Sequence, residues 1–396
     1  MVDGRSIIAS WAFCYLVVQH PQSSKKKIEF DCDTDLVIAN SFRVKLLYAG
    51  GYKKNISLSR YLHHLKLAFS FYKNAKLEKV PDLIVCSFPL IELTYAAIKY
   101  AKANKIPIVV DIRDPWPDII LQSLPSIPFF IFYPASKLMN LVIKNSFKYT
   151  SAITACSGGY LDWALKKFNS KRRILDKVFY LGCDDQKTNI NILVKNKFRK
   201  LENDLEGKFI VFFVGTFGHT YDLDLVVKAA RILHDECNEN IHFLLAGDGT
   251  KFSLILKKSR LLKNITFTGW LNQEDIKYLS SISDIGIIPM NQMNGCLPNK
   301  FYDYSCAGLP ILSSLEGDAN QLLSEYNFGM SYQKNNEHEL VKKVKLYACS
   351  EEMLKLHSRN SRFIFINKFD SRIIYDEFAQ YLGEIINAKN SLHIHN

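Results

Sequence analysis

Residues 208–249, KFIVFFVGTFGHTYDLDLVVKAARILHDECNENIHFLLAGDG, have the pattern of a strand, a helix and a second strand. The apolar runs 208–214 and 241–246 have the length of buried strands, and 222–235 has the spacing of an amphipathic helix. A glycine-containing turn, GTFG or GDG, follows each strand. This order predicts a parallel sheet that is covered by helices on both faces.

The same alternation continues toward Gly329. Further elements expected in this part are a lysine-rich helix after the GDG turn, strands at 265–268, 284–289 and 310–313, and helices at 273–282, from Lys300 and just before Gly329. We therefore predict a doubly wound domain over 185–366, followed by a C-terminal helix and tail over 367–396.

Residues 1–184 repeat this pattern less regularly. Expected here are strands at 83–86, 106–112, 152–156 and 178–181 and a helix at 91–104. We expect an N-terminal domain that lacks the strand, glycine loop and helix with which such domains usually open. The predicted fold class is α/β, with two Rossmann-like doubly wound domains facing each other across a cleft.

Bulk composition limits the possible partners. A chain of 396 residues is longer than one hydrophobic core usually organises, and its net charge of +12 favours an anionic partner such as a lipid headgroup, a nucleotide or a nucleic acid. Nucleic acid is the weakest of the three because no RNP-like, zinc-finger or helix-turn-helix pattern accompanies the basic residues. Nine cysteines, scattered singly, argue against a disulfide framework or a zinc site and favour the reducing cytosol.

The segment PNKFYDYSCAGLP, residues 298–310, places a cation and a carboxylate three residues apart at the start of a helix. Lys300 and Asp303 then share one helix face. A lysine in the first turn opposes the helix dipole, which is understandable if an anion such as a diphosphate docks at the exposed amides. Asp303 would hold a ribose or sugar hydroxyl. The alternative is an ordinary capped surface helix that stops at Gly308.

Five motifs occur in the order and approximate spacing found in retaining glycosyltransferases of family 4, which have the GT-B fold. They are GTFGHTYDLD from Gly215, LLAGDGT from Leu244, ITFTGWL from Ile265, DIGIIPM from Asp284 and PNKFYDYSCAGLP from Pro298. Residues 51–182 resemble the family less closely, through GGYKKNISLSRYLHH, CSFPLIEL, VVDIRDPWPD and ACSGGYLDWA. The resemblance is greatest to the branch that builds bacterial surface polysaccharides on lipid-linked intermediates.

This resemblance implies a retaining hexosyltransferase that moves a sugar from a nucleoside diphosphate sugar, with UDP as the expected nucleotide. The nucleotide sugar is a co-substrate, and neither a metal nor a further cofactor is expected. The acceptor would be a lipid-linked saccharide in O-antigen, capsule or exopolysaccharide synthesis, bound by the N-terminal domain. Alternatives are a nucleotide-sugar 2-epimerase of the same fold and a non-catalytic partner in polysaccharide assembly.

The resemblance also implies site residues in the C-terminal domain. Asp303 matches the second glutamate of the family's Glu-x7-Glu element, which contacts the ribose, whereas Gly295 stands at the first glutamate. The arginine and lysine of the phosphate loop are replaced by residues around Thr216 and Tyr221, which leaves more of the phosphate charge to Lys300. The expected donor-binding residues are Gly215, Thr216, Gly218, Gly247, Trp270, Leu271, Pro298, Asn299, Lys300 and Asp303.

Catalytic roles are expected for Arg113, Asp114 and Lys300. Arg113 and Asp114 follow a predicted strand, near the position of a histidine that faces the reacting sugar in many family members. Arg113 would offset leaving-group charge, and Asp114 would orient the acceptor hydroxyl or Arg113. The alternative is a structural ion pair that caps the strand.

Membrane contact is expected to be peripheral, on the inner face of the cytoplasmic membrane. Residues 128–148 mix aromatic and aliphatic side chains with Lys137, Lys144 and Lys148, as an interfacial helix does. A buried helix with solvated lysines is the alternative. The apolar run 7–18 is shorter than the roughly 20 residues that span a bilayer.

Overall fold

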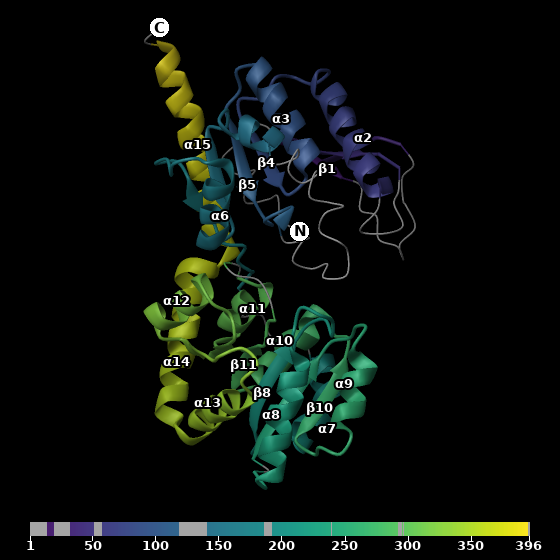
Figure 1. Cartoon of the computed structure of the whole chain (residues 1–396), viewed down its shortest axis with the longest axis vertical. Coiled ribbons are helices and arrows are strands. Elements are labelled where there is room, and N and C mark those ends of the chain that lie inside the picture. Colours follow the sequence, from purple (N-terminus) through teal and green to yellow (C-terminus); the bar gives the residue numbers. More distant parts are fainter. Residues whose placement is uncertain are drawn as a thin grey trace. The chain divides into compact units, whose positions relative to one another are not determined.

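The structure is a computed structural model that describes residues 14–19, 32–50, 58–118, 141–185, 192–238, 240–291, 295 and 297–394. The chain divides into two compact units. Unit 1 consists of Met1–Phe179 and Tyr375–Asn396, and unit 2 of Tyr180–Ile374. Figure 1 labels most of the helices and several strands of the two units. The chain thus passes from one unit to the other twice.

Unit 2 contains a six-stranded sheet in the order β10-β9-β8-β11-β12-β13, in which every neighbouring pair is parallel. Its strands are β8 (Phe209–Val214), β9 (Ile241–Ala246), β10 (Ile265–Gly269), β11 (Ile285–Ile288), β12 (Ile311–Ser313) and β13 (Gly329–Ser331). Most side chains of these strands are buried, because helices cover both faces of the sheet. The doubly wound α/β architecture predicted for this part of the chain is confirmed.

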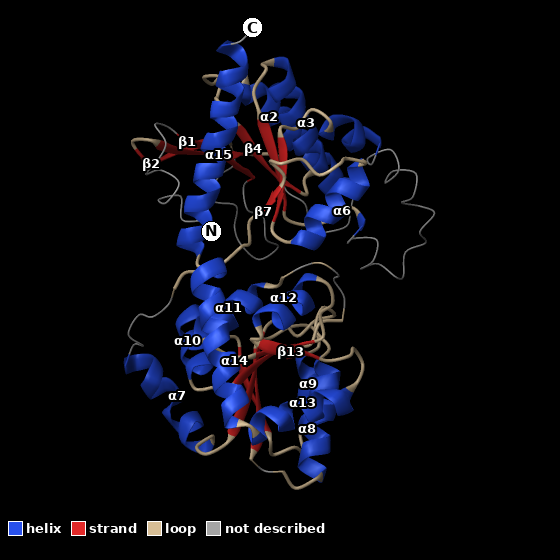
Figure 2. Ribbon diagram, turned by 90° about the vertical axis from the view of Figure 1, so that its left-hand side faces the viewer, coloured by secondary structure: helices blue, strands red, loops and turns tan. Residues whose placement is uncertain are grey.

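The helices of unit 2 form two layers. They are α7 (Ile192–Asp204), α8 (Leu223–Asp235), α9 (Phe252–Ser259), α10 (Gln273–Ser281), α11 (Asn299–Ala307), α12 (Asp318–Tyr326), α13 (Glu337–Cys349) and α14 (Glu351–Ile364). Figure 2 shows α8, α9 and α13 on one side of the sheet and α10, α11 and α14 on the other. Val226 of α8 and Val344 of α13 pack in one core with Phe213 and Phe243 from the sheet.

The strand order creates a switch point. β8 lies between β9 and β11, so the connections that leave β8 and β11 run to opposite sides of the sheet. Loops that diverge in this way open a crevice at the carboxyl edge, where ligands of doubly wound sheets bind. Helix α11 begins beyond β11, which places its amino terminus at this edge.

Unit 1 contains two sheets. A four-stranded parallel sheet has the order β4-β5-β6-β7, and a three-stranded sheet has the order β1-β3-β2 with β2 antiparallel to β3. The strands are β1 (Cys14–Gln19), β2 (Thr34–Ala39), β3 (Phe42–Leu47), β4 (Ile84–Phe88), β5 (Ile108–Ile112), β6 (Ala152–Ala155) and β7 (Lys177–Val178). The helices are α2 (Leu58–Ala75), α3 (Ile91–Ala103), α6 (Gly158–Phe168) and the greater part of α15 (Ser371–Ile394).

The helical period expected after residue 351 is interrupted. Helix α14 ends at Ile364, a π-helical segment follows over Phe365–Phe369, and Asp370 is extended. Asp370 forms an isolated parallel bridge with Cys183. From there α15 runs into unit 1, where Tyr381 and Ile385 pack against Val109 of β5.

The expected membrane segment is only partly within the described residues, since 119–140 lie outside them. Residues 141–147 are helical, with Ile143 and Phe147 buried and Lys144 exposed. Among the helices that the structure describes, none has both the length and the apolar character needed to cross a bilayer.

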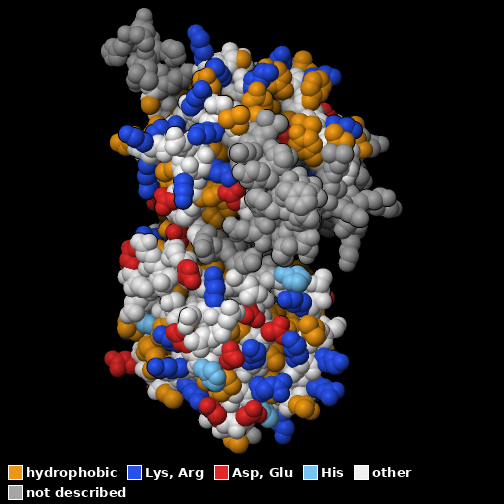
Figure 3. All heavy atoms as spheres, viewed as in Figure 1, with side chains coloured by type: hydrophobic (Ala, Val, Ile, Leu, Met, Phe, Trp, Pro, Cys, Tyr) orange, Lys and Arg blue, Asp and Glu red, His pale blue; other side chains and the backbone are white. Residues whose placement is uncertain are grey.

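Figure 3 shows basic side chains spread over the visible face of both units, with acidic side chains among them.

Candidate functional site

The loops that follow β8, β9 and β10 are joined by backbone hydrogen bonds at the carboxyl edge of the unit 2 sheet. The Gly215 amide donates to the Ala246 carbonyl at 2.9 Å, and the Gly247 amide donates to the Gly269 carbonyl at 2.7 Å. Gly247 has a φ of +131°, and a Cβ at this position would lie 1.8 Å from the Gly215 carbonyl oxygen. Only glycine therefore permits this approach of the two loops.

Lys300 is the second residue of α11, and its side chain is buried. Its Nζ lies 3.8 Å from the centroid of the Tyr221 ring and 5.2 Å from that of Phe213. A Cβ built on Gly215 would be 2.5 Å from Nζ, so the ammonium group rests against the backbone of the β8 loop. Lys300 and the loop that begins at Gly215 thus lie in contact, and both were predicted from the sequence to bind the phosphates.

Burial governs the titration of the two charged groups on α11. Desolvation lowers the pKa of Lys300 to about 7, although Asp303 acts in the opposite direction. Desolvation likewise raises the pKa of Asp303 to about 6, with Lys300 opposing it. Within the part of the chain that the structure describes, the two side chains form no ion pair with each other. A buried ammonium and a half-buried carboxyl in the first turns of a helix suit a ligand that carries negative charge and hydroxyl groups.

The other expected donor-binding residues lie on the same edge. Thr216 is exposed, and the Gly218 amide donates to its carbonyl at 2.9 Å. Beyond β10, Trp270 is 78% exposed whereas Leu271 is buried. Pro298 is the N-cap of α11, and the Asn299 side chain in its first turn is exposed.

The carboxyl end of α11 is fixed by Arg362 of α14. Its guanidinium donates to the Cys306 carbonyl at 2.7 Å and to both carboxylate oxygens of Asp185 at 2.7 Å. A cation at the carboxyl end of a helix interacts favourably with the helix dipole. Gly308 ends α11 with a φ of +75°, as the sequence predicted for its stop.

In unit 1, Arg113 follows β5 directly, and its Nε donates to Asp111. Asp111 is buried and also accepts a 2.8 Å hydrogen bond from Thr154 Oγ1. Burial is the largest single effect and disfavours the charged guanidinium, but Asp111, Cys156 and Tyr375 together raise the pKa of Arg113. Burial raises the pKa of Asp114. The carboxylate that accepts from the Arg113 guanidinium is that of Asp111, and the orienting role expected for Asp114 stays a prediction.

Two contacts of these sites were not predicted from the sequence. Asp111 stands two residues before Arg113, a spacing that places both side chains on the same face of a strand, so this pairing had a signal. Tyr221 was expected in the loop approached by the phosphates, but the contact of its ring with Lys300 was not predicted, because it joins segments far apart in the chain.

Comparison with known proteins gives one family match. Residues 194–362, which include the whole of the Lys300 site, match the model of the family described as Glycosyl transferases group 1. Comparison with curated protein sequences gave no match.

Solved structures resemble most of the chain. Anabaena Alr3699/HepE in complex with UDP has 16% identity and a TM-score of 0.66, with 86% of each chain covered. Sucrose-phosphate synthase from Thermosynechococcus elongatus has 13% identity and a TM-score of 0.71, covering 96% of this chain and 90% of that one. A glycosyltransferase from Rickettsia africae has 14% identity and a TM-score of 0.63, covering 85% and 84%. These structures confirm the predicted GT-B fold, and the match to the group 1 glycosyltransferase model covers residues 194–362.

Proposed function

We propose that the protein is a retaining glycosyltransferase that transfers a sugar from a UDP-linked donor to a lipid-linked saccharide, in the synthesis of bacterial O-antigen, capsule or exopolysaccharide. The observation that carries the proposal is the buried ammonium of Lys300, which lies against the β8 loop at the amino terminus of α11. The group 1 match covers this region, and the Anabaena protein of the same fold was solved with UDP.

The donor would be held by its charges. The first amides of α11 point toward the carboxyl edge without intrahelical partners, and they can donate to a diphosphate. Lys300 adds a charge-assisted hydrogen bond worth roughly 1.5 to 3 kcal/mol. Asp303, one turn further along α11, would accept hydrogen bonds from the ribose hydroxyls.

The chemistry would consist of positioning and charge stabilisation. Lys300 and the helix amides would stabilise the negative charge that develops on the leaving diphosphate. Retention of configuration then follows if a leaving phosphate oxygen takes the proton of the acceptor hydroxyl on the same face of the sugar. In unit 1, Arg113 and Asp114 would act on the leaving-group charge and the acceptor hydroxyl, with Arg113 kept charged by Asp111.

Membrane association is part of the proposal. A lipid-linked acceptor would bring the enzyme to the inner face of the cytoplasmic membrane, and each lysine near an anionic surface contributes on the order of 1 kcal/mol. Lys144 and Lys148, in the described part of the 128–148 segment, are exposed and available for such contacts.

The test is transfer of radiolabel from a panel of UDP-sugars to lipid extracts of membranes that carry the native acceptors. Lys300→Ala should lose most transfer and keep its melting temperature or exceed it. The matched control is Lys355→Ala, which removes an exposed lysine on α14. Transfer by Lys300→Ala at the control rate would contradict the proposal. Conversion of the donor without any acceptor would favour the epimerase, and UDP binding without turnover would favour the non-catalytic partner.

A further inference from the structure

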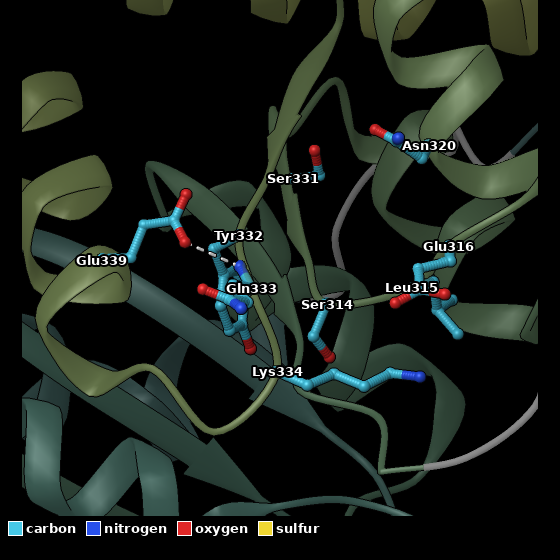
Figure 4. A pocket seen from close by; sticks show the side chains of 9 residues that line it. All are labelled: Ser314, Leu315, Glu316, Asn320, Ser331, Tyr332, Gln333, Lys334 and Glu339. Carbon is cyan, nitrogen blue, oxygen red and sulfur yellow. Dashed lines mark hydrogen bonds between the residues drawn. The ribbon is translucent and has the colours of Figure 1, made fainter.

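A second polar site lies at the carboxyl ends of β12 and β13, in the same sheet as the Lys300 site. It is a pocket of about 370 Å³, at the small end of the roughly 300 to 1,000 Å³ range of ligand pockets. Figure 4 shows the side chains that line it. Ser314 and Glu316 follow β12, Asn320 belongs to α12, and Ser331 and Lys334 come from the end of β13 and its loop.

The pocket adjoins the surroundings of Lys300 through direct contacts. Ser314 Oγ donates to the Met290 carbonyl at 3.0 Å. Met290 forms an isolated antiparallel bridge with Tyr221, whose ring lies 3.8 Å from the Lys300 ammonium. Two residues therefore separate the pocket wall from the group that is proposed to bind the diphosphate.

The loop that carries Glu316 also approaches the segment before α11. A Cβ built on Gly317 would lie 3.6 Å from the Gly295 amide nitrogen, so the two backbones are in van der Waals proximity. Gly295 stands five residues before Lys300. The pocket thus borders the Lys300 site on two sides, through β11 and through the approach to α11.

The groups in the pocket are those that recognise hydroxyls. A carboxylate accepts hydrogen bonds, an ammonium donates them, and amide and hydroxyl groups do both. Glu316 is exposed, and among the described residues it has no hydrogen-bond or ion-pair partner. In Figure 4 the Lys334 side chain extends toward the side of the pocket where Glu316 lies. Glu339, by contrast, accepts from the Gln333 amide at 2.8 Å and so holds the β13 loop in place.

From this arrangement we infer that the pocket is the subsite for the hexose of the donor, with Glu316 and Lys334 as the residues that select its hydroxyl pattern. The inference rests on the proposed function, because it assumes that a nucleoside diphosphate occupies the Lys300 site. A hexose joined to that diphosphate would present neighbouring hydroxyls to a carboxylate and an ammonium at once. Specificity for one sugar then depends on which hydroxyls meet each group.

The experiment separates the sugar from the nucleotide. Calorimetric titrations with UDP, UDP-glucose, UDP-galactose and UDP-N-acetylglucosamine would be made on the wild-type protein, Glu316→Gln and Lys334→Met. Matched controls are Glu325→Gln on α12 and Lys342→Met on α13, both exposed and outside the pocket lining. Melting temperatures establish that each variant is folded.

We expect the wild type to bind at least one UDP-hexose more tightly than UDP. Glu316→Gln and Lys334→Met should each reduce this advantage by roughly tenfold, the loss of one charge-assisted hydrogen bond, and leave the affinity for UDP unchanged. Hydrogen exchange over residues 314–320 and 331–334 should slow with that UDP-hexose and not with UDP.

The subsite is refuted if the pocket variants keep the full advantage of the UDP-hexose over UDP, or if the wild type binds every UDP-hexose with the affinity of UDP. Failure of the proposed function looks different, since the wild type would then not bind UDP at all. Lys300→Met distinguishes the two cases further, because it should weaken UDP and UDP-hexoses equally.

Discussion

The low pKa of Lys300 makes donor binding depend on pH. Burial lowers this pKa from 10.5 to about 7, so the free protein holds the ammonium half-protonated near neutrality. A bound diphosphate favours the protonated form. Affinity for UDP should therefore be greatest below about pH 7 and fall as the pH rises, by about 5-fold between pH 7 and 8 and about 50-fold between pH 7 and 9. Lys300→Met should bind UDP more weakly and show no pH dependence over this range.

Proton uptake provides a direct assay. Calorimetry at about pH 8, in two buffers of different ionisation enthalpy, should detect uptake of about 0.9 proton for each UDP bound by the wild type and none for Lys300→Met. This window isolates the lysine, because the pKa of Asp303 is about 6 and phosphate groups also titrate near 6. Lys355→Met should behave as the wild type. An affinity that stays constant from pH 7 to 9 without proton uptake would refute the reasoning.

The same shift has a consequence for stability. An unfolded lysine keeps its proton up to about pH 10.5, whereas the folded one loses it near 7, so the unfolded state binds more protons between these values. The free energy of unfolding of the unliganded protein should therefore rise with pH across this interval. Lys300→Met should remove this slope and raise stability near neutrality, which urea titrations at several pH values would measure.

Two further predictions concern the surroundings of the ammonium. Tyr221→Leu removes the ring whose centroid lies 3.8 Å from the Lys300 Nζ and should weaken UDP binding by about 1 to 2 kcal/mol. Tyr221→Phe keeps the ring and should bind UDP as the wild type does. Equal affinities of the Leu and Phe variants for UDP would exclude a cation–π role. Gly247→Ala should lower the melting temperature and abolish UDP binding, because the added Cβ would meet the Gly215 carbonyl oxygen. Gly383→Ala, in α15 with no atom within 4 Å of the added Cβ, should instead stabilise the protein by about 0.5 to 1 kcal/mol, and a destabilised variant would contradict this.

Strands and helices with strong hydrophobic periods could be predicted from the sequence. The strand expected at 284–289 is β11, Ile285–Ile288, and the helix expected at 273–282 is α10, Gln273–Ser281. β13 was not predicted, since its three residues, Gly329–Ser331, are too few to show a period. Its position depends on pairing with β12, which local sequence does not reveal.

Other features that depend on pairing between distant segments could not be predicted either, because local sequence does not reveal such pairing. The helical period beyond residue 351 gives no sign of the break at Asp370, where the backbone pairs with Cys183 from a distant part of the chain. The candidate site shows the same division. The spacing of Lys300 and Asp303 at the start of α11 indicated both residues, and Tyr221 was expected in the phosphate loop, but the sequence did not indicate that its ring would lie against the lysine.

The second passage of the chain between the units bears on how the protein matures during translation. Tyr381 and Ile385 belong to the core of unit 1, and the Tyr381 hydroxyl donates to the Leu175 carbonyl at 2.7 Å. Those residues leave the ribosome only after all of unit 2 has been synthesised. Unit 2 can therefore complete its core on a nascent chain, whereas residues 1–179 can complete theirs only after residues 375–396 have been synthesised. A premature stop shortly after residue 374 would leave residues 1–179 with an exposed hydrophobic face.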